Sequence, residues 1–167
     1  MRSNYSLTVF TLLFSLFIYM FYRTERTLIN EIARFILSFD TYAEMRAAIT
    51  HAVPLNEPVI FSLPGGLWVF CTSILSKDFY MKILDHKIQV FIIPVMFAIG
   101  LELFQLLHLA NGRFDPWDIG CYLLFWLLAY LSFKPGRPQQ DILSPFTLNS
   151  FICIACFLSV YLAHVGR

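Results

Sequence analysis

The sequence predicts an all-α fold: a polytopic membrane helix bundle with about five transmembrane helices and one interfacial amphipathic helix. Of the 167 residues, 58% are hydrophobic and 14% are charged, whereas roughly a quarter of the residues of a soluble domain are charged. The mean hydropathy is +0.66. Five apolar stretches of about 20 residues each would leave only short connections. We therefore expect residues 1–167 to form a single integral membrane domain.

The expected spans lie at about 7–22, 58–75, 88–109, 117–133 and 146–165. Each is long enough to cross a bilayer core as a helix, and lipid does not tolerate exposed irregular backbone. The first span follows Arg2 as a signal peptide would, but no small-residue cleavage site follows it, so we expect an uncleaved anchor. Pro64-Gly65-Gly66 interrupts the second span, and its two glycines would let another helix or a ligand approach closely.

The long connection between the first two spans, about 26–50, predicts an amphipathic segment. Such a helix lies in the membrane interface or packs over the bundle as a lid. Its apolar residues recur with the spacing of one helical face: Leu28, Ile29, Ile32, Phe35, Ile36 and Phe39.

The charges indicate an orientation but no nucleic-acid partner. The net charge of +1 provides no basic surface for nucleic acid. Five spans place six Lys or Arg residues on each side, so their count alone gives no orientation. Because Lys77, Lys82 and Lys87 lie in a short loop close to span ends, we expect a cytoplasmic N-terminus.

One carboxylate is expected deep in the third span. Glu102, Gln105 and His108 recur every three residues and so follow one side of that helix. Asn111-Gly112 is a typical helix stop, and counting back from it places Glu102 about 15 Å from the hairpin, near the bilayer centre. A carboxylate at that depth is a candidate for function by default.

We expect Glu102 to be protonated or tightly hydrogen-bonded. Arg113 would have to reach past Gln105 to meet it, so a direct ion pair is not expected. Gln105 lies one turn outward, and Tyr122 lies at a similar height across the hairpin. Both side chains can donate a hydrogen bond to a carboxyl group.

The fourth span begins with helix-starting residues. Asp115 suits the N-cap, Pro116 the first helical position and Asp118 the first turn. Both aspartates therefore have a capping interpretation beside a functional one. The functional interpretation is an outward-opening pocket, with Arg113 and Asp118 at its mouth and a lining formed by Ser62, the Pro64-Gly66 break, Glu102, Gln105 and Tyr122.

Metal and cofactor sites are not expected. Glu102, His108, Asp115 and Asp118 carry suitable ligand atoms, but their spacing matches no compact metal motif. Ser62 has no base beside it in the sequence that would make it a nucleophile.

The polar residues of the third and fourth spans resemble the motif of the VanZ-like family of small bacterial membrane proteins. In that family a Glu-x-x-Gln near the end of a span precedes a Gly-Arg and the Asp residues that open the next span. The resemblance covers about residues 55–133, and the chain departs from the family pattern at Tyr122 and Phe125, where the family has Asn and Gly. It implies a multi-pass protein of the bacterial inner (cytoplasmic) membrane, linked to the cell envelope. The matching residues are Glu102, Gln105, Gly112, Arg113, Asp115 and Asp118.

Three functions are compatible with these observations. The first is the binding of a polar or lipid-linked envelope ligand, with Gln105, Arg113, Tyr122, Ser62 and Asp115 as binding residues. The second is an intramembrane enzyme on a lipid or lipid-linked substrate, with Glu102 as acid or base and Asp118 as a second acid. The third is a small accessory subunit of a larger membrane complex. The expected partners are membrane lipids, a lipid-linked ligand or another membrane protein.

The orientation gives a first testable prediction. A cysteine placed at 113, in a background without the four native cysteines, should react with an impermeant maleimide added to intact cells. The reason is that an N-terminus inside the cell puts the loop after the third span outside. Labelling that requires permeabilised cells would reverse the predicted orientation.

Overall fold

The computed structural model describes residues 2–23, 28–83, 86–109, 113–132 and 139–165. These residues are mostly helical, which confirms the prediction of an all-α fold at that level. The bounds of α1, α5, α7 and α8 lie close to those expected for four of the spans. The α-helices are α1 (Arg2–Tyr22), α2 (Leu28–Leu37), α3 (Phe39–Ala52), α4 (Glu57–Phe61), α5 (Leu63–Ser76), α6 (Ile93–Leu106), α7 (Pro116–Ser132) and α8 (Leu148–Val165).

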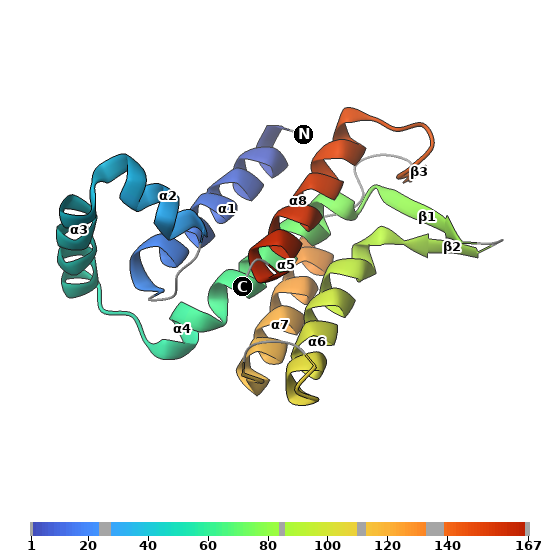
Figure 1. The fold of residues 1–167 in the computed structure, drawn as a ribbon. Helices are drawn as coiled ribbons and strands as arrows, with labels where there is room; N and C mark the ends of the chain where they lie inside the picture. The colour runs from blue at the N-terminus through green and yellow to red at the C-terminus, as the bar shows by residue number, and fades with distance from the viewer. Residues whose placement is uncertain (1, 24–27, 84–85, 110–112, 133–138, 166–167) are drawn as a thin grey trace.

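Helix α5 is the centre of the bundle. It contacts α1, α6, α7 and α8, and the α4 helix leads into it (Figure 1). Helices α2 and α3 lie at one end, beside α1 and apart from α6 and α7 (Figure 1). The amphipathic segment expected at 26–50 thus forms two helices.

A small sheet was not predicted. Strand β1 (Phe79–Ile83) pairs antiparallel with β2 (His86–Gln89) and parallel with β3 (Gln140–Asp141). The expected start of the third span at residue 88 is therefore wrong, because residues 86–89 form β2. A 3-10 turn, η1 (Val90–Ile92), comes before α6, and Pro94 in the first turn of α6 is suited to a helix start.

Helix α1 buries small polar residues and exposes large apolar ones. Thr8, Thr11 and Ser15 are buried, whereas Phe10 and Leu13 on the other face are exposed. The Ser15 hydroxyl donates to the Pro64 carbonyl of α5 at 3.3 Å. Small residues and side-chain hydrogen bonds at a helix interface are typical of helix packing in lipid.

One continuous stretch of the described residues, Glu57–Ser76, is long and apolar enough to cross a membrane. It comprises α4 and α5, which meet at Ser62, so the break predicted at Pro64 begins two residues earlier. Proline has no N–H to donate to the carbonyl one turn before it, which explains the irregularity. Shorter apolar helices cover Ser6–Tyr22, Val90–Leu106 and Leu148–Leu158.

The two glycines of α5 contact another helix. A Cβ atom added at Gly65 would lie 2.6 Å from Cε1 of Tyr122, and one at Gly66 would lie 2.6 Å from Cδ2 of Phe125 and 2.7 Å from Sγ of Cys121. The space beside both glycines is therefore filled by α7. The glycines line no open pocket there, because the close approach that they allow is used for helix packing.

Side chains of α3 cap the C-terminal end of α1. The Arg46 guanidinium donates to the carbonyls of Phe21 (3.0 Å) and Tyr22 (3.4 Å), and the Tyr42 hydroxyl donates to the Met20 carbonyl. A cation at this end complements the helix dipole. These bonds fix the α2–α3 pair to the end of α1.

At the other end of the bundle, Lys77 follows directly after α5. Its ammonium group donates to the Tyr130 carbonyl near the end of α7 (3.1 Å) and lies 5.4 Å from the Phe91 ring centre. Burial lowers the pKa of Lys77, while the neighbouring Asp78 acts in the opposite direction. Lys77 is thus a packed cation that joins α5 to α7 rather than a loop charge.

The glycine contacts give a prediction for stability. Gly66→Ala should lower the free energy of unfolding in detergent by about 1–3 kcal/mol, because the new methyl group overpacks the α5–α7 contact. The control is Gly100→Ala in α6, where an added Cβ meets nothing within 4 Å. Its stability should be unchanged or slightly raised, because alanine favours helices. Equal thermal unfolding midpoints for the two variants would contradict the close α5–α7 packing.

Candidate functional site

Helix α6 ends earlier than the sequence predicted, which changes the position of Glu102. His108 adopts a left-handed conformation (φ 57°), and the N–H of Leu109 donates to the Phe104 carbonyl at 2.8 Å. These are the features of a Schellman C-cap, and histidine is among the residues enriched in this conformation. The stop predicted at Asn111-Gly112 is wrong, and those two residues lie outside the described part of the chain.

Glu102 is consequently close to the α6–α7 hairpin. It lies four residues before the last residue of α6, Leu106, or about 6 Å by helix rise, rather than the predicted 15 Å. The carboxyl group is buried, with 3% of the residue exposed. It thus has to be satisfied by partners at this end of the bundle.

Three groups donate hydrogen bonds to the Glu102 carboxyl. The Tyr122 hydroxyl donates to Oε1 at 3.3 Å, and the backbone N–H of Asp115 donates to Oε2 at 3.4 Å. With its amide nitrogen directed at Glu102, Gln105 donates to Oε2 at 3.3 Å and to the Arg113 carbonyl at 3.1 Å. The predicted partners Gln105 and Tyr122 are confirmed. Glu102 thereby joins α6 to the first turns of α7.

The two aspartates have different surroundings. Asp115 accepts a bond from the Trp117 N–H at 2.9 Å through Oδ1, as an N-cap residue does. Asp118 lies in the first turn of α7, close enough to Glu102 for the two carboxyl groups to interact electrostatically. The capping prediction is confirmed for Asp115, whereas Asp118 belongs to the buried acidic cluster.

Ser62 lies at the level of Asp118 on the facing helix. Gly65 meets Tyr122, Phe70 packs edge-on against Phe125 and Lys77 meets Tyr130, so α5 and α7 run parallel. One turn before the Gly65–Tyr122 contact lie Ser62 on α5 and Asp118 on α7.

Both Ser62 and Asp118 carry a buried oxygen without a partner. Neither the Ser62 hydroxyl nor Oδ1 of Asp118 has a hydrogen-bond partner among the described residues. Ser62 itself is 4% exposed. Unsatisfied buried polar atoms are costly, so two at one level indicate a place for a hydrogen-bonding ligand or water. We call Ser62, Glu102, Asp118 and Tyr122 the acidic cluster.

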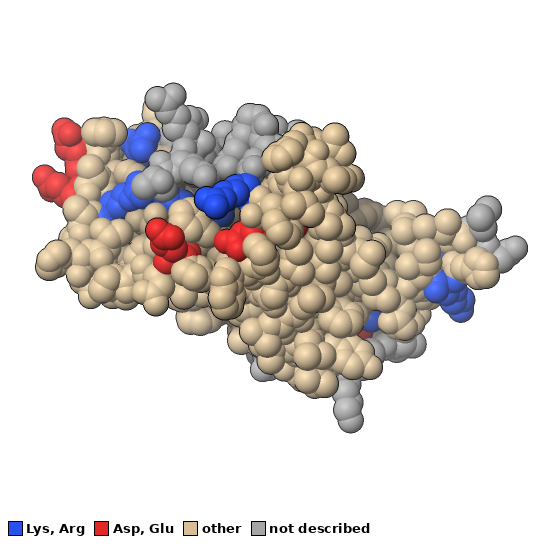
Figure 2. Space-filling view, turned by 90° about the horizontal axis from the view of Figure 1, so that it is seen from below, with Lys and Arg blue, Asp and Glu red and all other residues tan. Residues whose placement is uncertain are grey.

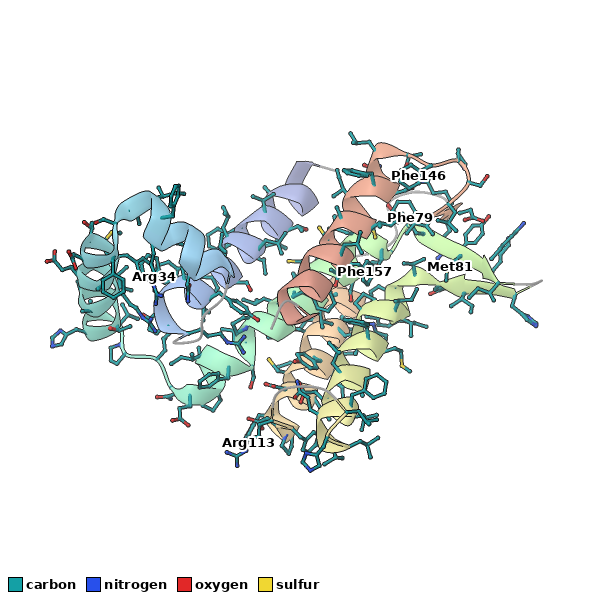
Figure 3. All side chains as sticks on the ribbon, in the orientation of Figure 1. Arg34, Phe79, Met81, Arg113, Phe146 and Phe157 are labelled. Atoms are coloured by element: carbon teal, nitrogen blue, oxygen red, sulfur yellow. The ribbon has the colours of Figure 1, made fainter. Side chains whose placement is uncertain are left out.

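Among the described residues, one basic side chain beside Ser62 was not predicted from the sequence. Arg113 is exposed, and Figure 3 shows it at the end of the α6–α7 hairpin, directed away from the bundle. Arg23, which follows α1, instead donates to the Phe61 carbonyl at 3.4 Å, next to Ser62 in the chain. Arg23 comes directly after Tyr22, the last residue of the first predicted span. This position could have indicated Arg23 as a candidate.

The described residues contain no group of three or more His, Cys, Asp or Glu side chains arranged to hold a metal ion. His108, one of the four weighed as ligands, is exposed at the end of α6. What the cluster can do is accept hydrogen bonds and hold or transfer a proton between two carboxyl groups.

The comparisons with known proteins add no assignment. No protein-family model, curated protein or solved structure matches the chain.

The capping geometry gives a prediction for Asp115. Asp115→Ala should lower the free energy of unfolding by about 0.5–2 kcal/mol, because the cap bond to Trp117 is lost, whereas Asp115→Asn should be mild because asparagine is an equally good N-cap. The bond from the Asp115 backbone to Glu102 is retained in both. Thermal unfolding in detergent measures the difference. A large loss with Asn would assign Asp115 a role that needs its charge.

Proposed function

We propose that this chain is a multi-pass protein of the bacterial inner membrane, of VanZ-like type and with a cytoplasmic N-terminus. The exposed apolar side chains support this proposal, because a soluble monomer rarely exposes so much contiguous apolar surface. Many of them lie on α1, α6, α7 and α8 around the bundle, while small polar residues of α1 face α5. The exposed set includes Phe10, Leu13 and Phe14 of α1, Met96, Leu103 and Phe104 of α6, Leu123, Leu124 and Leu127 of α7, and Phe151 and Leu158 of α8.

The chain's proposed activity is to bind the polar part of a membrane lipid or lipid-linked envelope compound at the acidic cluster. The observation that carries this proposal is the pair of buried, unpartnered oxygens of Ser62 and Asp118 at one level between α5 and α7. The cluster lies near one end of the bundle, where a headgroup can enter while its acyl chains stay against the apolar exterior. Figure 2 looks at that end and shows acidic and basic side chains close together on it.

The proximity of the carboxyl groups of Glu102 and Asp118 favours enzymatic turnover of the bound lipid as a second candidate. Two carboxyl groups that share a proton can act as acid and base in one reaction. In that case Glu102→Gln would abolish turnover while leaving binding in place.

The binding proposal predicts which substitutions release the ligand. Protein purified in mild detergent should carry a lipid or lipid-linked compound detectable by mass spectrometry. Its amount should fall at least about fivefold in Asp118→Asn and Ser62→Ala, because each removes a hydrogen bond at the cluster. Glu44→Gln on the exposed face of α3 is the matched control and should retain the ligand. If all variants fold and carry the same lipids in equal amounts, the cluster is only helix packing and capping.

A further inference from the structure

The acidic cluster has a cation at its edge. The Arg23 guanidinium lies 4.5 Å from the ring centre of Tyr19 and 5.7 Å from that of Phe61. Its Nη2 donates to the Phe61 carbonyl, while its Nε is buried with no partner among the described residues. Arg23 therefore has an Nε donor without a partner, and its Nη2 is bonded to the residue that precedes Ser62.

Tyr19 connects this cation to the cluster. Its side chain contacts Arg23 and is also close enough to Tyr122 to interact with it electrostatically. Tyr122 in turn donates to Glu102. Arg23 itself reaches the site through the Phe61 carbonyl, next to Ser62 in the chain.

We propose that this site binds the phosphoethanolamine headgroup of an aminophospholipid, with its ammonium group at Asp118 and Ser62 and its phosphate at Arg23. The inference rests on the proposed lipid-binding function and adds the chemical class of the ligand. An ammonium group donates three hydrogen bonds, and the oxygens of Asp118 and Ser62 that lack partners can accept them. Its positive charge also complements the neighbouring acidic side chains.

Other headgroups leave part of the site unsatisfied. A choline group has no N–H to donate, so Oδ1 of Asp118 would remain without a partner. A phosphoglycerol group has hydroxyl donors but no positive charge for the acid pair, and a free anion is repelled by Glu102 and Asp118. A neutral sugar has no group for Arg23. The phosphoethanolamine group has both charges, so it offers N–H donors to Ser62 and Asp118 and an anion to Arg23.

The test measures lipid affinity of the full-length protein in detergent by native mass spectrometry. The ligands are phosphatidylethanolamine, phosphatidylcholine and phosphatidylglycerol with identical acyl chains, and soluble O-phosphoethanolamine. We expect phosphatidylethanolamine to bind about tenfold tighter than either other lipid, which corresponds to one charge-assisted hydrogen bond.

Asp118→Asn and Ser62→Ala should reduce the protein's preference for phosphatidylethanolamine over phosphatidylcholine to within about threefold. Arg23→Gln should weaken all three lipids, because each has a phosphate, while Lys82→Gln and Glu44→Gln on exposed positions should change nothing.

The possible outcomes distinguish the headgroup assignment from the proposed lipid binding itself. Equal affinity for all three lipids, with each weakened by Asp118→Asn, would overturn the headgroup assignment and leave lipid binding at the cluster in place. Tighter binding of phosphatidylglycerol would also overturn the assignment. Lipid affinities that do not respond to Asp118→Asn, Ser62→Ala or Arg23→Gln would contradict both proposals. If soluble O-phosphoethanolamine competes at the same concentration as the lipid, the headgroup chemistry is supported. The natural ligand would then be a soluble compound, which contradicts a membrane lipid as the ligand.

Discussion

The close approach of α5 and α7 at Gly65 and Gly66 is the constraint on which the rest of the structure depends. With any larger residue at these positions, Tyr122 and Phe125 would be displaced from α5. Because Tyr122 is held there, its hydroxyl reaches Glu102 on α6, and three helices meet at one buried carboxyl group. The same contact sets the parallel register that brings Ser62 level with Asp118.

The burial of Glu102 follows from the shape of the α6–α7 hairpin. Its carboxyl accepts bonds from the Asp115 backbone at the start of α7, where the helix dipole favours negative charge. A second acid, Asp118, shares the same space, and two adjacent carboxyl groups are satisfied only with a proton or a bound cation between them. Glu102 therefore stabilises the hairpin, whereas part of Asp118 remains available to a ligand.

The sequence predicted the helices well where hydrophobic length alone decides them, as for α1, α5, α7 and α8. It misjudged the end of α6, because His108 adopts the left-handed position that was expected of glycine. It missed the sheet because the third strand pairs residues more than 50 positions apart, and register over such a distance is not encoded locally.

For the site, local spacing was sufficient to predict Tyr122 and Gln105 as partners of Glu102 and Asp115 as an N-cap. Whether Ser62 lies opposite Asp118 depends on how α5 packs against α7. No pattern within either helix contains that information. The place of Arg113 at the mouth of the site stays a prediction, and its side chain is exposed at the hairpin end. Which arginine lies beside the cluster depends on how α1 packs against α4, and that packing selects Arg23.

A density map of the full-length protein in lipid nanodiscs, at a resolution that resolves side chains, would show whether a ligand lies at the acidic cluster. We expect lipid chains against α1, α6, α7 and α8, and density within hydrogen-bonding distance of both Oδ1 of Asp118 and the Ser62 hydroxyl. An Asp118 side chain turned out to bulk water, with the Ser62 hydroxyl bonded within its own helix and no density between them, would contradict the proposed site.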